Sequence, residues 1–146
     1  TNHTPLLYGN DKPSVPDNLP SNQRGDFVRS SDNLLWLFSR QWIPPSKQQP
    51  ILATLLILHG TVDHGGVYDE FATLLNKAGI AVFCTDMRGW GLSDGESYYF
   101  HHVDVFVQDV KDQYQRIQQQ FPQVQHHFIL GKSIGGLIAA HAVCSD

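Results

Sequence analysis

A serine stands in a glycine-rich turn near the end of the sequence, in the stretch GKSIGG at residues 131–136. Strand-forming residues 128–130 precede this turn, and helix-forming residues follow it from Ile134. In such a GxSxG turn the serine hydroxyl projects from the top of a sheet, and the two glycines avoid collisions with the neighbouring backbone. The dipole of the following helix favours negative charge near the hydroxyl. The pattern therefore predicts Ser133 as the nucleophile of an acyl-transfer reaction.

A phosphate-binding turn is the alternative interpretation of this stretch. Lys132 beside Ser133 would suit an anion, but phosphate loops have the spacing GxxxxGK[ST], which is not found here. The order of strand, turn and helix is instead the context in which a nucleophilic serine is mounted. We therefore favour the acyl-transfer interpretation.

Acyl transfer also places negative charge on the carbonyl oxygen of the substrate, and backbone amides commonly stabilise this charge. One such amide is expected from Ile134, the residue after the nucleophile. The other is expected from the loop after the first buried strand, which continues as HGT at residues 59–61. We predict that the amides of Thr61 and Ile134 form this oxyanion hole.

A nucleophilic serine needs a base within about 3 Å and an acid that orients the base. In this arrangement the acid and then the histidine follow the serine along the chain. Here only His141 and Asp146 follow Ser133, in the reverse order, and His141 lies eight residues further on. Along a helix that separation is about 12 Å, at roughly 1.5 Å per residue. We therefore expect the sequence to be a fragment of a longer chain that supplies the acid and the base, and to be inactive on its own.

The elements around these residues are expected to form a parallel sheet with crossover helices, because strand-like and helix-like segments alternate along the chain. Apolar runs predict buried strands, and amphipathic periodicity predicts helices. The fold class is thus α/β, with a hairpin ahead of the parallel strands. The expected hairpin strands are 27–29 and 34–43, the later strands are 51–58, 80–85 and 128–130, and the helices are 67–78, 103–121 and 134–145.

Two regions are expected in the chain. Residues 1–24 hold four of the eight prolines and show neither strand nor helix periodicity, so we interpret them as an irregular extension. Residues 25–146 are interpreted as part of one domain.

The composition disfavours several classes of partner. A net charge of −4, with charged residues spread without blocks, provides no basic patch for nucleic acid or an anionic membrane. The longest apolar run, 51–58, is shorter than the roughly 20 residues of a membrane span. Metal-ligand spacing is not found at the two cysteines, Cys84 and Cys144. It is not found at the histidine pairs 101–102 and 126–127 either. We expect two buried free thiols, no metal and no cofactor.

The stretch LHGTVDHGGVYDEFATLLNKAGIAVFCTDMRGWGLSDGE, followed by GKSIGG, resembles the α/β-hydrolase superfamily. Within it the sequence is similar to monoacylglycerol lipases and lysophospholipases, which are grouped by fold with the serine aminopeptidase (S33-type) domain. The likeness runs from about Gly25 to the end of the chain and rests on the order HG, DxRGxGxSxG, GxSxG. It implies the N-terminal part of an α/β-hydrolase domain whose C-terminal strands and lid are absent from this sequence.

The resemblance implies roles for individual positions. Ser133 matches the family nucleophile, and Thr61 and Ile134 match the residues whose amides form the oxyanion hole. Asp86 and Arg88 match a motif that mainly shapes the loop beside the pocket.

Two positions depart from the family pattern. Val67 and Lys132 stand where the family usually has arginine and histidine. The loop that contains His59 adjoins the serine turn, but the family uses the backbone beside this histidine and not its ring. His59 is therefore disfavoured as a substitute base.

The function implied by the resemblance is a serine ester hydrolase that forms an acyl-enzyme. Its substrate would be a lipid-like ester such as a monoacylglycerol or a lysophospholipid, and the absent lid leaves peripheral membrane contact open. A peptidase or thioesterase of the same fold and a non-catalytic binding module are the alternatives, because fold does not fix function. The location stays open, with the cytoplasm or a membrane surface expected.

Overall fold

The structure is a computed structural model of the chain, and it describes residues 9–19, 24–45, 47, 49–99 and 102–145. Five strands, three α-helices and one short 3-10 helix occur within these residues. The strands are β1 (Arg24–Arg29), β2 (Trp36–Trp42), β3 (Ala53–Leu58), β4 (Ile80–Thr85) and β5 (His127–Gly131). The helices are η1 (Gly65–Tyr68), α1 (Asp69–Lys77), α2 (Val103–Gln120) and α3 (Ile134–Cys144).

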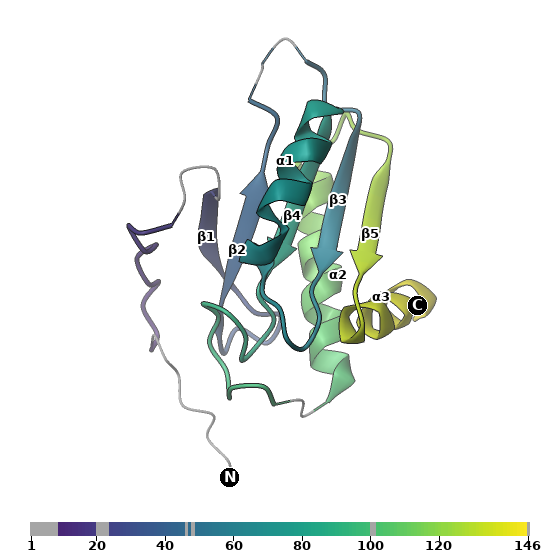
Figure 1. The fold of residues 1–146 in the computed structure, drawn as a ribbon. Coiled ribbons are helices and arrows are strands. Elements are labelled where there is room, and N and C mark those ends of the chain that lie inside the picture. The colour runs from purple at the N-terminus through teal and green to yellow at the C-terminus, as the bar shows by residue number, and fades with distance from the viewer. Residues whose placement is uncertain (1–8, 20–23, 46, 48, 100–101, 146) are drawn as a thin grey trace.

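The strands form one mixed sheet in the order β1-β2-β4-β3-β5 (Figure 1). β3 pairs in parallel with both β4 and β5, and β2 pairs antiparallel with β1 and with β4. Parallel strands need crossover connections, and α1 and α2 supply them. The predicted α/β class, with a hairpin followed by parallel strands and crossover helices, is confirmed.

The boundaries of some elements differ from the expected ones. β1 begins at Arg24, so the hairpin includes the last residue that was assigned to the irregular extension. The helix expected from Val67 begins as the 3-10 turn η1 and becomes α-helical only at Asp69. The ring of His64 accepts a hydrogen bond from the Gly66 amide at 3.0 Å, which caps this first turn. Residues 9–19 contain neither helix nor strand.

Helices cover both faces of the sheet, and the side chains of each strand alternate between these faces. Val82 and Cys84 of β4 belong to the cluster on the α1 side, together with Ala72 of α1. Ala81 and Phe83 of the same strand belong to the larger cluster that α2 and α3 cover. This burial on both faces explains why the strand is apolar at every position from Ile80 to Cys84.

β5 lies at the edge of the sheet opposite the hairpin (Figure 1). Among the described residues it pairs with β3 alone. The side chains of Phe128 and Leu130 on this strand are 55 % and 41 % exposed. An apolar strand with an open edge is a surface on which further chain can pair.

One of the two thiols differs from the prediction. Cys84 is buried, and its burial raises the pKa of the thiol, but Cys144 is exposed at the end of α3. The sequence of α3 is apolar around most of its circumference, so apolar composition alone does not locate the buried side. In the described part of the chain, no helix is long and apolar enough to cross a membrane.

Candidate active site

The residues predicted to carry chemistry meet at the carboxyl ends of neighbouring parallel strands. The chain leaves β3 toward α1 on one face of the sheet and leaves β5 toward α3 on the other face (Figure 1). Two adjacent parallel strands whose helices lie on opposite faces define a switch point, where open α/β sheets bind ligands. The loop after β3 and the turn after β5 border this point, and they contain Thr61 and Ser133.

Ser133 occupies the turn between β5 and α3 in a backbone conformation that L-residues rarely adopt, with φ 55° and ψ −121°. Such a conformation costs about 1–3 kcal/mol and persists only where the surroundings enforce it. The Lys132 amide donates to the Leu58 carbonyl at 3.0 Å, and the Gly135 amide donates to the Lys132 carbonyl at 2.9 Å. These bonds hold the turn against β3 and leave the Ser133 side chain exposed to solvent.

The two glycines of the GxSxG frame are required by close backbone contacts. A Cβ atom on Gly131 would lie 2.4 Å from the Gly135 carbonyl oxygen, and one on Gly135 would lie 2.2 Å from the Leu58 carbonyl oxygen. Neither contact involves a flexible side chain that could move aside. The sequence-based reason for these glycines, avoidance of collisions in a tight turn, agrees with the geometry.

Gly135→Ala is therefore expected to lower the free energy of unfolding by about 3 kcal/mol, the upper end of the usual cost of overpacking. The matched control is Gly136→Ala, one residue further along α3. There the added Cβ would lie 3.3 Å from the nearest atom, the Gly131 carbonyl oxygen, so only a small adjustment is needed. Urea unfolding of both variants measures the difference, and equal losses of stability would contradict the proposed role of Gly135.

His59 is completely buried beneath the loop after β3. Its Nε2 accepts a hydrogen bond from the Met87 amide at 2.9 Å, so the proton of the neutral ring resides on Nδ1. Nδ1 then donates to the Gly60 carbonyl at 2.8 Å. Burial lowers the pKa of the imidazole, which keeps it neutral. Both nitrogens are engaged, so the geometry disfavours His59 as a base, as expected.

The same histidine orients the Gly60–Thr61 peptide group. The Gly60 carbonyl accepts from His59 and also from the Asp63 amide at 3.1 Å. In a planar trans peptide the following N–H points to the side opposite the carbonyl. The Thr61 amide is thus directed away from His59. Gly60 itself lies close to the serine turn, because a Cβ atom placed on it would be 3.5 Å from the Ser133 Cβ.

An ion pair connects the two loops that flank the switch point. Lys132 Nζ lies 2.8 Å from Asp63 Oδ2, and the same oxygen accepts from the Gly60 amide and from the Tyr68 hydroxyl, each at 3.3 Å. The hydrogen bond from Lys132 lowers the pKa of the Asp63 carboxyl. Sequence reasoning did not identify Asp63. Its partner is 69 residues away, and no local pattern joins the two.

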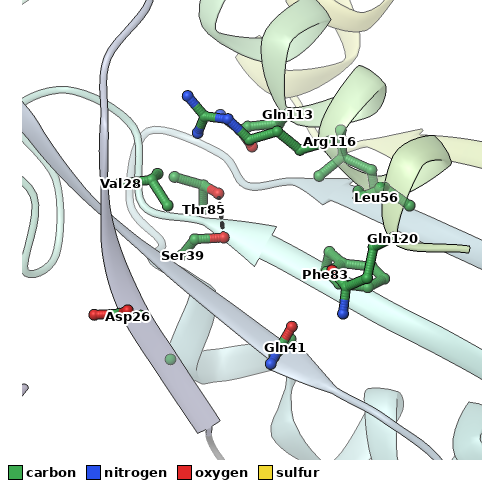
Figure 2. A pocket seen from close by; sticks show the side chains of 12 residues that line it. Asp26, Val28, Ser39, Gln41, Leu56, Phe83, Thr85, Gln113, Arg116 and Gln120 are labelled. Carbon is green, nitrogen blue, oxygen red and sulfur yellow. Dashed lines mark hydrogen bonds between the residues drawn. The ribbon is translucent and has the colours of Figure 1, made fainter. Parts of the chain in front are cut away.

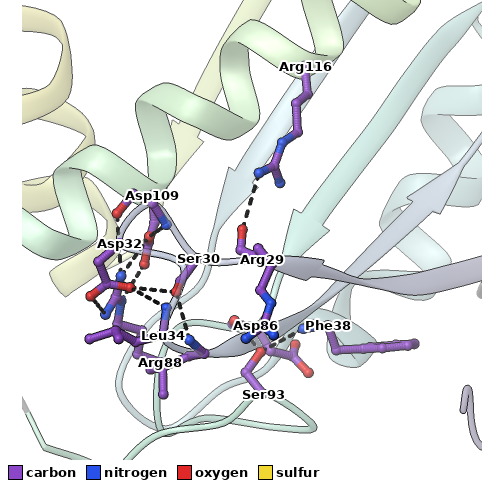
Figure 3. A network of polar contacts seen from close by, with 12 residues as sticks. Arg29, Ser30, Asp32, Leu34, Phe38, Asp86, Arg88, Ser93, Asp109 and Arg116 are labelled. Carbon is purple, nitrogen blue, oxygen red and sulfur yellow. Dashed lines mark hydrogen bonds and ion pairs between the residues drawn. The ribbon is translucent and has the colours of Figure 1, made fainter. Parts of the chain in front are cut away.

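Asp86 forms the buried centre of the glycine-rich loop after β4 (Figure 3). Its carboxylate pairs with the equally buried Arg40 and accepts the amides of Gly65 at 2.7 Å and Leu92 at 2.9 Å. Its carbonyl accepts the Ser93 hydroxyl at 2.6 Å. Asp86 thereby holds β2, η1 and its own loop together.

Arg88 ties the same loop to α2 and to the β1–β2 turn (Figure 3). Its guanidinium contacts Asp109 at 2.6 Å and Asp32 at 2.7 Å. Burial opposes ionisation of Asp32, but hydrogen bonds from Arg88 and Ser30 outweigh it and lower its pKa to about 2. Asp86 and Arg88 thus make structural contacts, as the loop-shaping role implied for them requires.

A crevice of about 210 Å³ lies between α2 and strands β1, β2 and β4 (Figure 2). Polar side chains such as Gln41, Gln113 and Arg116 line it, over an apolar floor that includes Phe83. Neither Ser133 nor Thr61 nor Ile134 borders it. The crevice is therefore separate from the candidate active site. Among the described residues, no group of three or more histidine, cysteine or acidic side chains is arranged to hold a metal ion.

The chain is similar in sequence to known proteins over most of its length. Residues 49–146 match the serine aminopeptidase (S33) family. Over 125 residues the chain is 33 % identical to the monoglyceride lipase of Rattus norvegicus and 35 % identical to that of Mus musculus. Each of these alignments covers 86 % of this chain and 39 % of the relative, so the chain spans well under half the length of these relatives.

A solved structure of similar fold is a highly thermostable carboxyl esterase from Bacillus coagulans in complex with glycerol. The TM-score is 0.73 at 18 % sequence identity, over 86 % of this chain and 41 % of the esterase chain. At this identity the likeness concerns the fold alone. It agrees with the mixed sheet and the crossover helices described above.

Proposed function

Because the chain belongs to the serine aminopeptidase (S33) family of α/β-hydrolases, with monoglyceride lipases among its relatives, we propose that it forms the nucleophile-bearing part of a serine hydrolase that cleaves lipid-like carboxylic esters. The observation that carries the proposal is the exposed Ser133 in its strained turn, beside the loop that presents Thr61. A binding module would not need a backbone strain of this kind at an exposed serine.

In the proposed reaction, Ser133 Oγ attacks the carbonyl carbon of the ester while a base accepts the hydroxyl proton. The amides of Thr61 and Ile134 donate to the oxyanion of the tetrahedral intermediate. The alcohol departs with the proton returned by the base, and water then hydrolyses the acyl-serine to release the carboxylic acid. The oxyanion would lie near the start of α3, where the helix dipole favours negative charge.

The base and the acid of this reaction are proposed to come from the part of the relatives' length that this chain does not span. His59 is unsuitable because both ring nitrogens make hydrogen bonds within the fold. His141 lies two turns along α3, about 12 Å from Ser133 at 1.5 Å per residue. The chain by itself is therefore proposed to be inactive toward esters.

A lipid-like ester is the substrate class we propose, and its support is the similarity to the rat and mouse monoglyceride lipases. A peptidase or thioesterase of the same family is the second candidate, because the acyl-serine chemistry is shared. These candidates differ in the leaving group, so competition between substrates separates them.

The test is covalent labelling of the full-length protein with a fluorophosphonate, followed by mass spectrometry of its peptides. We expect the label on Ser133, and we expect a monoacylglycerol to slow labelling more than a peptide amide or a thioester of equal chain length. A label on another serine, or none, would overturn the nucleophile assignment. Stronger protection by the peptide or the thioester would leave the assignment of Ser133 as nucleophile intact but would contradict the proposed lipid-like ester substrate.

A further inference from the structure

Trp90 occupies the centre of the glycine-rich loop, between Gly89 and Gly91. Both glycines have positive φ, 81° and 55°. A Cβ atom on Gly89 would lie 2.1 Å from the Glu96 carbonyl oxygen, and one on Gly91 would lie 2.1 Å from Asp86 Oδ2. The backbone on each side of Trp90 can therefore adopt this path only with glycine. The path turns the indole inward rather than toward solvent, and Trp90 is only 2 % exposed.

The indole ring is fixed by packing on several sides. Its centroid lies 5.6 Å from that of Tyr98, 6.5 Å from that of Phe106 and 6.4 Å from that of the His59 ring. From this position Nε1 donates a hydrogen bond of 2.7 Å to the Thr61 carbonyl. A buried tryptophan N–H usually finds such a partner, but here the partner belongs to the loop predicted to form the oxyanion hole.

We propose that Trp90 is a positioning residue, which holds the Thr61 amide in the orientation that oxyanion stabilisation requires. The inference rests on the proposed function. Thr61 lies between two peptide groups, and each carbonyl is held by a side chain from below the loop. His59 fixes the Gly60 carbonyl and Trp90 fixes the Thr61 carbonyl, so the backbone of Thr61 has little freedom to rotate.

The loop needs such a tether because it has little packing of its own. Thr61 is exposed, and the side chain of Val62 is 91 % exposed. An amide donor in a mobile loop would have to be ordered during the reaction, whereas a preorganised donor costs nothing at that moment. The hydrogen bond also links the glycine-rich motif to the serine turn through the loop after β3. The hydrogen bonds to the Asp86 carboxylate hold the loop that carries Trp90, and Trp90 in turn holds Thr61.

The experiment replaces the indole N–H without changing the ring shape. β-(3-Benzothienyl)alanine at position 90 of the full-length protein keeps the bicyclic ring and puts sulfur in place of the N–H. We expect kcat for an ester to fall about tenfold with KM within about twofold. This is less than the roughly 10²- to 10³-fold cost of removing an oxyanion donor outright, because the Thr61 amide stays present but less well aligned.

A second readout separates positioning from general structure. The affinity for a boronic acid or trifluoromethyl ketone, which forms a tetrahedral adduct with the serine, is expected to fall by the same factor as kcat. Tyr98→Phe is the matched control, since it keeps the ring against Trp90 and removes only a hydroxyl from a side chain that is 73 % exposed. The control is expected to leave kcat and inhibitor affinity unchanged.

The possible outcomes distinguish this inference from the function on which it rests. Unchanged kcat and inhibitor affinity in the benzothienyl variant would overturn the role of Trp90 alone. A rise in KM with kcat unchanged would also overturn it, because this pattern indicates loss of ground-state binding. If the unaltered protein shows no hydrolysis that depends on Ser133, the proposed function fails and this inference fails with it.

Discussion

Ser133→Ala in the full-length protein is expected to lower kcat for an ester substrate by about 10⁶-fold, as loss of the serine does in other hydrolases with a catalytic triad. In the proposed reaction the nucleophile, base and acid act as a unit, so the remaining members cannot compensate once the hydroxyl is lost. The oxyanion hole and substrate binding would still leave about 10³- to 10⁴-fold acceleration over water. The measurement is initial-rate kinetics with a monoacylglycerol and with a short-chain ester.

The stability of Ser133→Ala is expected to stay within about 1 kcal/mol of the unaltered protein, because the side chain is exposed and alanine meets the same backbone strain as serine. Ser97→Ala is the control, since this exposed serine lies in the loop after β4. It is expected to leave the rate unchanged. Retention of more than about a tenth of the activity by Ser133→Ala would refute the assigned nucleophile.

The serine turn and the sheet around it could be predicted because their signals are local. Glycines at fixed offsets from Ser133, an apolar run before it and helix formers after it all lie within a short stretch of the sequence. The strands β3 and β4 are apolar at every position except Thr54 and Thr85, and a nearly continuous apolar run is the signal of burial on both faces. The parallel core and the placement of the serine follow from these patterns.

The contacts that hold the loop after β3 could not be predicted in the same way. Trp90 and Thr61 are 29 residues apart, and the Trp90 side chain bonds to a backbone carbonyl that any residue at position 61 would offer. Neither periodicity nor composition encodes such a bond. The two glycines beside Trp90 were visible in the sequence, but only their positive φ values explain why the indole points inward.

Sheet order explains why the loop after β3 is held from both sides. β3 lies between β4 and β5, so its loop lies between the loop that carries Trp90 and the turn that carries Ser133. Trp90 holds Thr61 from the first side, and Lys132 holds Asp63 from the second. A loop held by both neighbours keeps a fixed geometry relative to Ser133, which the proposed stabilisation of the oxyanion requires.

The centre of this scaffold is the pair Asp86–Arg40, and Asp86→Ala is expected to lower the free energy of unfolding by about 3–5 kcal/mol. Both side chains are buried, with 0 % and 3 % exposed area, so the variant would leave the Arg40 charge buried without its partner. The amides of Gly65 and Leu92 would also lose their acceptor. Urea unfolding of the full-length protein measures the loss.

Two controls separate the buried charge from the loss of a carboxylate in general. Asp26→Ala removes an acid whose side chain is 57 % exposed and pairs with the exposed Lys12, and it is expected to cost less than about 1 kcal/mol.

Arg40→Met combined with Asp86→Leu removes both buried charges and is expected to recover a large part of the stability lost in Asp86→Ala, since a well-packed apolar pair can replace a buried ion pair. If the double variant were no more stable than Asp86→Ala, neutralising Arg40 would not be the main role of Asp86, and the bonds to the Gly65 and Leu92 amides, which both variants lack, would account for the loss. The loop that supports Trp90 would then depend on these two backbone contacts.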